Sequence, residues 1–264
     1  MHEWGDAEAP RVVCIHGVSA HGRRYRRLAE ERLAARFHVL APDLRGHGLS
    51  GWEPPWNLET HREDVLETVG DEPAMWVGHS FGGRLVLELA ARRPQLVPRA
   101  VLLDPAIDIL PHVGFDFAQN AATEREFTSP DEAIDARLNG ESMTPRAAVE
   151  EEAREHLEQL PNGAWRWRYA RAAVTTMYSE LCRTPPPPAV LRDIPTLLLY
   201  AEHFGLVREE QLEEYPAVLG DGLELVGVAG GHIVYWDAFE ETADAVEEFL
   251  MRHSPVSHPR NARR

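Results

Sequence analysis

The sequence alternates short apolar runs with amphipathic segments, and this alternation restricts the fold more than any other feature. The runs are residues 11–15, 37–41, 74–78, 100–104, 196–201 and 223–228, each short enough to be a buried strand. The amphipathic segments predict helices at residues 23–36, 58–69, 85–91, 208–219 and 238–250. Strands that alternate with helices in this way predict an α/β fold: a mostly parallel sheet covered by helices on both faces.

The alternation stops between residues 107 and 188, where no strand-like run occurs. Proline follows a helix-capping residue at Ser129-Pro130 and Thr144-Pro145, which is a helix-start signal. We expect helices over residues 145–160 and 165–182, followed by an extended proline-rich connector at 184–188. This segment is interpreted as a helical cap inserted into the α/β core.

The length of 264 residues favours one domain with an insertion over two independent domains. The first part of the core is expected at residues 1–106, the cap at 107–190 and the second part of the core at 191–252. Residues 253–264 are polar and contain proline, so they are predicted to be a disordered tail.

Composition excludes several classes of function. The chain has 27 Lys and Arg against 43 Asp and Glu, and all 27 are arginine, so Schiff-base and P-loop chemistry are excluded. The net charge of −16 argues against nucleic-acid binding. Cys14 and Cys182 lack metal-site spacing, and no metal site is predicted. Without a signal-like segment or a long apolar run, the chain is expected to be cytoplasmic and without stable membrane insertion.

One motif indicates a catalytic residue because of its position between two predicted elements. Gly78-His79-Ser80-Phe81-Gly82 has the pattern G-x-S-x-G, between a predicted strand and a predicted helix. Glycines flank the serine because the strand turns into the helix so sharply that a nearby Cβ would clash. The turn exposes the Ser80 hydroxyl at a helix N-terminus, where developing negative charge is favoured. Ser80 is therefore the candidate nucleophile.

Four motifs in chain order resemble the landmarks of the α/β-hydrolase superfamily. They are His16-Gly17, the segment DLRGHGLS at residues 43–50, the segment GHSFGG at 78–83, and Gly230-Gly231-His232. Within the superfamily the chain resembles actinobacterial lipases and carboxylesterases, through residues 43–56, 103–106 and 160–163. The resemblance implies an α/β-hydrolase fold with an inserted cap and a Ser-His-acid triad.

The resemblance implies that His232 is the base for Ser80, because the family places the nucleophile first and the histidine last. Two glycines precede His232 and free its loop to reach over the site. The backbone N–H groups of Phe81 and Val18 are expected to bind the oxyanion. The side chain of His79 is expected to leave the turn in another direction.

The acid departs from the usual family pattern. Family members usually carry it just after the strand that ends here at residue 201, where this chain has Phe204. Phenylalanine cannot hold an imidazole tautomer or stabilise imidazolium. We favour Asp104, because some α/β-hydrolases carry their acid at that strand end and it lies beside the histidine loop. Glu202 is the alternative acid.

Three other groups of residues are expected to have structural rather than catalytic roles. His16 and His47 are expected to brace loops near the site. Most aromatic and sulfur side chains of the cap, together with Trp236, are expected to pack the cap onto the core, with an apolar acyl pocket as the alternative. These are Trp165, Trp167, Tyr169, Met177 and Tyr178. The segment containing Glu150, Glu151, Glu152 and Glu155 is expected to be an exposed helix face.

The sequence therefore predicts a serine hydrolase that cleaves carboxylic esters through an acyl-enzyme, with no cofactor. The expected partner is a small ester with an apolar acyl group; no oligomeric state is predicted. One alternative keeps the site but cleaves a thioester or a carbon–carbon bond. The other is a non-catalytic module that binds a small ligand, since Phe204 stands where the acid is usual.

Overall fold

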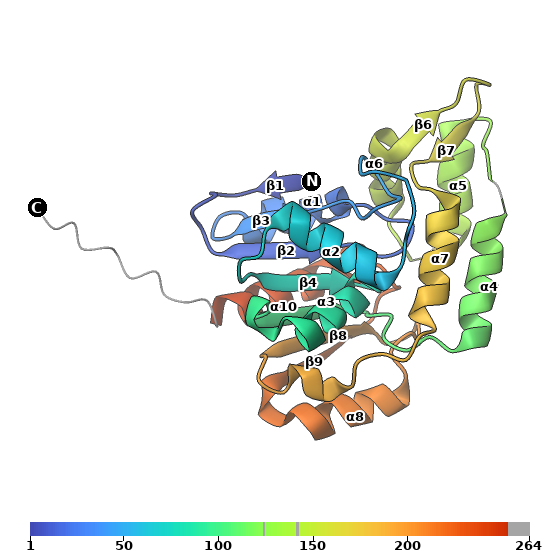
Figure 1. The fold of residues 1–264 in the computed structure, drawn as a ribbon. Helices are drawn as coiled ribbons and strands as arrows, with labels where there is room; N and C mark the ends of the chain where they lie inside the picture. Colours follow the sequence, from blue (N-terminus) through green and yellow to red (C-terminus); the bar gives the residue numbers. More distant parts are fainter. Residues whose placement is uncertain (124, 141–142, 253–264) are drawn as a thin grey trace, which may run out of the picture.

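A central parallel sheet organises the computed structural model, which describes residues 1–123, 125–140 and 143–252 (Figure 1). The predicted tail at 253–264 lies outside these residues. The sheet has seven strands in the order β1-β3-β2-β4-β5-β8-β9. They are β1 (His2–Trp4), β2 (Arg11–Ile15), β3 (His38–Ala41), β4 (Met75–His79), β5 (Arg99–Leu103), β8 (Thr196–Ala201) and β9 (Leu223–Val228). Only β1 is antiparallel to its neighbour, so the predicted mostly parallel sheet is confirmed.

Helices cover both faces of the sheet, as predicted. They are α1 (Arg26–Leu28), α2 (Leu58–Val69), α3 (Phe81–Arg92), α8 (Glu209–Leu219), α9 (Val234–Asp237) and α10 (Phe239–Arg252). Alternate strand residues enter different cores: Val13 packs with α2, α3 and α8, whereas Val12 packs with α1 and α10. The predicted helix at 23–36 is a 3-10 turn, then α1, then a π-helical turn (Ala29–Leu33). Strand β1 was not predicted.

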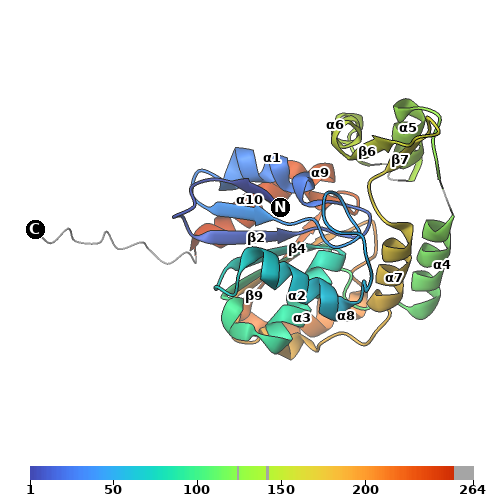
Figure 2. The same cartoon turned by 45° about the horizontal axis from the view of Figure 1, so that its top comes forward.

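The segment between β5 and β8 forms the cap, which stands at one end of the sheet in both views (Figures 1 and 2). Its helices are α4 (Pro111–Ala122), α5 (Pro130–Gly140), α6 (Arg146–His156) and α7 (Arg171–Leu181). The cap also contains an antiparallel hairpin of β6 (Leu157–Gln159) and β7 (Trp165–Trp167).

The prediction that the cap lacks strands was therefore wrong, as were the full lengths of the helices expected at 145–160 and 165–182. The Trp-Arg-Trp sequence of β7 alternates with the period of a strand. Trp167 is buried in the cap cluster, while Arg166 pairs with Glu158 of β6 at 2.6 Å. Gly163, with φ of 86°, closes the turn between the strands.

The prediction that α6 presents an exposed acidic face was wrong for Glu152, which is only 3% exposed. Its Oε1 accepts a hydrogen bond from Arg24 Nε at 2.7 Å and lies 3.4 Å from Arg137 Nη2. Burial alone would raise the pKa of Glu152, but the charges of Arg137 and Arg24 hold it below its usual value. This buried contact joins α6 of the cap to the start of the core.

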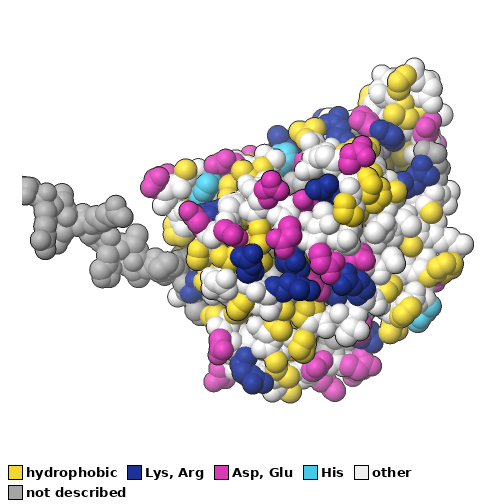
Figure 3. Space-filling view, viewed as in Figure 1, with side chains coloured by type: hydrophobic (Ala, Val, Ile, Leu, Met, Phe, Trp, Pro, Cys, Tyr) yellow, Lys and Arg dark blue, Asp and Glu magenta, His cyan; other side chains and the backbone are white. Residues whose placement is uncertain are grey.

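Arginines on the face that carries α2 and α3 are interspersed with acidic side chains rather than collected in one patch (Figure 3). Arg45 contacts Asp64 at 2.6 Å, and Arg183 contacts Glu59 and Glu180 at 2.7 Å each. Both of these arginines are therefore paired with carboxylates on this face.

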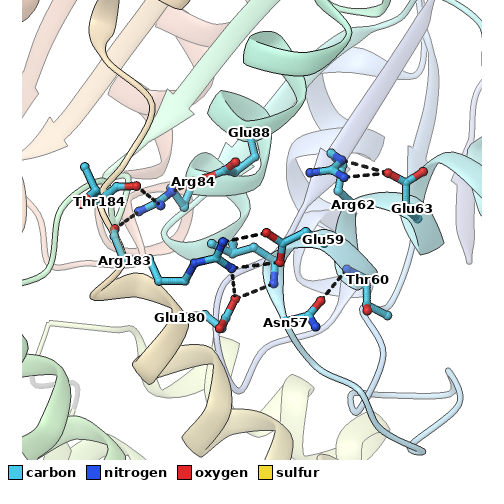
Figure 4. A network of polar contacts seen from close by, with 11 residues as sticks. Asn57, Glu59, Thr60, Arg62, Glu63, Arg84, Glu88, Glu180, Arg183 and Thr184 are labelled. Carbon is cyan, nitrogen blue, oxygen red and sulfur yellow. Dashed lines mark hydrogen bonds and ion pairs between the residues drawn. The ribbon is translucent and has the colours of Figure 1, made fainter.

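Arg84, on α3, binds the backbone at both ends of the cap, and Figure 4 shows its contacts at the end formed by residues 183–184. It is only 1% exposed and pairs with Glu88 at 3.0 Å. Its guanidinium also donates to the carbonyl oxygens of Ile107, Arg183 and Thr184, at 2.8, 3.1 and 3.1 Å. Because residue 107 lies where the chain enters the cap and residues 183–184 where it leaves, one side chain fixes both connections.

Two buried histidines hold the loops that follow β2 and β3. His16 Nε2 accepts the N–H of Leu44 at 2.8 Å, and His47 Nε2 accepts the N–H of Ser19 at 3.2 Å. Burial lowers the pKa of each histidine to about 3, with a further contribution to His16 from His47. Both rings therefore brace backbone in the neutral form.

Replacing Arg84 with methionine is expected to reduce the free energy of unfolding by about 3–5 kcal/mol, because the buried carbonyl group of Ile107, two partly buried carbonyl groups and Glu88 lose their donor. Arg183→Met is the control: its side chain is 47% exposed and that of its partner Glu59 is 41% exposed, so the loss should be about 0–1 kcal/mol. Urea unfolding of both variants measures the difference. Equal losses would contradict the assigned role of Arg84.

Stability is expected to fall as the pH is lowered from 7 to 5. The folded protein keeps His16 and His47 neutral, whereas in the unfolded chain they gain protons near pH 6.5. The unfolded state therefore binds more protons below that pH, at a cost of about 1–2 kcal/mol for each histidine by pH 5. Urea unfolding at the two pH values tests this, and a stability that stays constant would contradict the neutral native state of these histidines.

Candidate active site

Ser80 lies in a strained turn between β4 and α3. Its backbone has φ of 54° and ψ of −117°, a conformation that non-glycine residues rarely adopt. The neighbouring glycines are sterically required: a Cβ at Gly82 would lie 2.1 Å from the carbonyl oxygen of Ile15, and one at Gly78 would lie 2.4 Å from the Gly82 oxygen. The G-x-S-x-G motif thus forms the sharp strand-to-helix turn that its sequence context predicts.

The turn is attached to the neighbouring strands on both sides. The N–H of Ser80 donates to the carbonyl oxygen of Leu103 at the end of β5, at 3.1 Å. On the other side Gly17 approaches so closely that a Cβ there would lie 2.9 Å from the Ser80 Cβ. Val18 follows Gly17, and Phe81 opens α3 with an N–H in the first turn, where no intrahelical acceptor exists. Both predicted oxyanion donors therefore belong to segments that adjoin the serine.

Asp104 and His232 form a direct contact. The Oδ2 atom of Asp104 lies 2.6 Å from His232 Nδ1, and its Oδ1 accepts the N–H of Ala201 at 3.1 Å. Asp104 is fully buried and has φ of 36°, and its own N–H donates to the carbonyl oxygen of Leu199 at 2.7 Å. Each carboxylate oxygen thus has a partner, and β8 holds the side chain toward the histidine.

Neither Glu202, the alternative acid, nor Phe204, the residue at the usual acid position, has a hydrogen bond to His232 among the contacts of the described residues. Glu202 is exposed, and its carboxylate lies against β9, where a Cβ on Gly227 would come within 2.6 Å of it. Phe204 stacks on the imidazole of His232, with ring centroids 4.7 Å apart and planes 13° apart. The residue at the usual acid position therefore packs against the histidine instead of hydrogen bonding to it.

His79 supports the histidine loop, a contact that the sequence analysis missed. Its side chain turns away from Ser80, and its Nε2 lies 2.8 Å from the backbone oxygen of His232, with the two rings 4.6 Å apart. Burial holds the pKa of His79 well below its usual value, and the neighbouring His232 lowers it further. The neutral ring can donate one hydrogen bond to the loop. Only its position beside the serine in the sequence hinted at this contact.

Ser80 and His232 both line one cavity of about 120 Å³, which we call the inner cavity. Val18 lines it as well. A second cavity of about 490 Å³, the outer cavity, is lined by His232 but, among the described residues, not by Ser80. The two cavities share part of their walls, formed by Phe117, Tyr178, Phe204, His232 and Ile233.

Of the cap side chains considered as an acyl pocket, only Tyr178 lines either of these two cavities. Trp165, Trp167 and Tyr169 belong to the cap cluster, and Met177 is buried in the core. Packing is therefore the role of most of these residues. Across the described ranges, no group of three or more His, Cys, Asp or Glu side chains is arranged to hold a metal ion. Nor does any described helix have both the length and the apolarity to cross a membrane.

Comparisons with known proteins agree with this architecture. Lipase LipV of Mycobacterium tuberculosis is 34% identical over 244 residues, which cover 89% of this chain and 90% of that protein. The mouse sn-1-specific diacylglycerol lipase ABHD11 is 27% identical over 259 residues, covering 93% and 82%. Among solved structures, E-2-(acetamidomethylene)succinate hydrolase superposes with a TM-score of 0.83 at 24% identity, covering 94% and 93%, which is a likeness of fold alone.

The family model described as the alpha/beta hydrolase fold matches residues 10–239, which include Ser80, Asp104 and His232. Because this match spans most of the sequence, the chain belongs to the α/β-hydrolase family.

Proposed function

We propose that the protein is a serine hydrolase that cleaves carboxylic esters through an acyl-enzyme. The observation that carries this proposal is the 2.6 Å contact between Asp104 and His232 beside a cavity that His232 shares with Ser80. The names of the relatives, lipase and diacylglycerol lipase, support ester hydrolysis as the reaction class.

In the first half of the proposed reaction, Ser80 Oγ attacks the ester carbonyl carbon while His232 Nε2 accepts the hydroxyl proton. The carbonyl oxygen becomes an oxyanion, which the N–H groups of Phe81 and Val18 bind. When the intermediate collapses, His232 gives the proton to the alcohol oxygen and the alcohol leaves. The acyl group then remains bonded to Ser80.

In the second half, water attacks the acyl-enzyme while His232 accepts one of its protons. Collapse of this intermediate returns the proton to Ser80 and releases the carboxylic acid. Ester and water supply every atom of the products, so the proposed cycle needs no cofactor. The apolar walls of the inner cavity, among them Ile109 and Leu181, favour an apolar acyl group.

Asp104 is proposed as the acid because its carboxylate would fix the tautomer of His232. Its Oδ2 accepts the proton on Nδ1, which leaves Nε2 of His232 able to take the serine proton. A buried carboxylate at 2.6 Å also stabilises the imidazolium that forms. Phe204 adds a stacked aromatic face beside the same ring.

Replacing Ser80 with alanine is expected to reduce kcat on p-nitrophenyl esters by about 10⁴–10⁶, because no other nucleophile is placed at the elbow. The fold should persist, since alanine fills the same backbone position, and circular dichroism checks this. Unchanged turnover in Ser80→Ala would reject the serine mechanism. If the folded wild-type protein turns over thioesters or β-diketones but no simple esters, the reaction is cleavage of a thioester or carbon–carbon bond instead. If it binds small ligands without any turnover, it is a non-catalytic binding module.

Replacing Asp104 with asparagine is expected to reduce kcat by a factor on the order of 10⁴, because the amide no longer selects the productive tautomer of His232. Glu202→Gln is the matched control. Its carboxylate faces β9, so kcat should change by less than about twofold. Steady-state kinetics of both variants on one ester decides between the two acids, and the reverse pattern would assign the role to Glu202.

A further inference from the structure

The two cavities at the site differ in which reacting groups they contact. The inner cavity, of about 120 Å³, is lined by Ser80, Val18 and His232, whereas the outer cavity, of about 490 Å³, is lined by His232 but, among the described residues, not by Ser80 or Val18. The inner space is therefore about one quarter of the outer space. The difference in volume limits which half of an ester fits into which cavity.

The reaction fixes which half of the ester enters which cavity. The carbonyl carbon must bond to Ser80, and its oxygen must face the N–H groups of Phe81 and Val18, so the acyl substituent starts from the inner cavity. The alcohol oxygen must come within hydrogen-bond distance of His232, because that residue returns the proton to it. The alcohol substituent then extends past His232, which is where the outer cavity begins.

We infer that the preferred substrates are esters of a short apolar acid with a bulky alcohol. This inference rests on the proposed function and adds the substrate class. Apolar side chains form part of the wall of the inner cavity: Ile109 and Leu181 are nearly fully buried, and Leu206 packs against the same core. An acyl chain that exceeds the inner cavity must displace packed side chains, which costs about 1–3 kcal/mol.

The arginine at the inner cavity does not alter this assignment. Arg24 lines that cavity, but its Nε and Nη2 atoms both lie 2.7 Å from Oε1 of Glu152. The guanidinium also lies over the ring of Trp236, 4.8 Å from its centroid. Arg24 thus serves the contact between core and cap.

The outer cavity combines apolar and polar walls, which suits an alcohol with both kinds of surface. Phe117 and Met143 are partly exposed apolar side chains on its wall. Thr144 donates a hydrogen bond to Asp237 at 2.7 Å on the same wall, and Arg137 stacks on Trp167 beside it. An aromatic or polycyclic alcohol with polar substituents matches these surfaces.

Two series of esters test the inference on the wild-type protein. In the first, p-nitrophenyl acetate, butanoate and octanoate keep the alcohol constant, and kcat/KM is expected to fall about tenfold or more from butanoate to octanoate. In the second, methyl, benzyl and 2-naphthylmethyl acetate keep the acyl group constant, and acid release is followed by titration. Here kcat/KM is expected to rise about tenfold with the size of the alcohol. An optimum at octanoate, or equal rates across the acetates, would overturn the inference.

Two matched truncations separate the cavities. Leu206 lines only the inner cavity of the two, and Met143 only the outer one. Leu206→Ala is expected to move the acyl optimum toward longer chains and to leave the naphthylmethyl-to-methyl ratio of kcat/KM unchanged. Met143→Ala is expected to lower that ratio about threefold or more, with the acyl preference unchanged. The opposite pattern would reverse the assignment of the two halves.

These outcomes distinguish the inference from the proposed function. Ester turnover that depends on Ser80 but favours long acyl chains would retain the serine esterase and reject the short-acyl class. Absence of turnover on every ester in both series would reject the proposed function, and the inference would fall with it.

Discussion

The close approach between the start of α3 and the end of β2 is the constraint on which the site depends. A single added methyl group at Gly82 would meet the Ile15 carbonyl at 2.1 Å, and one at Gly83 would meet Pro105 at 2.6 Å. The helix that follows Ser80 is therefore wedged between the loops after β2 and β5. Those loops carry the proposed oxyanion donor Val18 and the proposed acid, so one packing contact sets the positions of three functional groups.

The same helix also connects the chemistry to the cap. Ser80 precedes its first residue, and Arg84 lies one turn later, where it binds the carbonyl groups at both cap connections. Lysine could not replace it, because a single ammonium cannot present a planar fork to four acceptors. The buried contact of Glu152 with Arg24 adds a second attachment on the opposite side. Two buried arginines thus attach the cap to the core.

Much of this arrangement follows from local sequence, and the rest depends on partners far along the chain. The other six strands of the central sheet, and the turn at Ser80, have short-range signals in apolar runs and glycines. The three-residue β1 has no such signal, and it pairs antiparallel with the edge that residues 39–41 of β3 offer. The hairpin of the cap is predicted as helix because the segment around it is rich in Glu, Ala and Arg, although the tryptophans of β7 are typical of strands. Burial of Glu152 was unpredictable from its own helix, since Arg24 lies more than a hundred residues earlier.

The position of the acid and the shape of the site are linked. A carboxylate after β8 would occupy the space beside His232 that Phe204 fills in this chain. With the proposed acid on β5 instead, that space holds an aromatic ring, which stacks on the imidazole and forms part of the wall shared by both cavities. Moving the acid therefore does more than replace one carboxylate by another. Because the acid is elsewhere, position 204 can carry an apolar side chain. Phe204 lies where the cavity beside Ser80 and the larger cavity beside His232 meet.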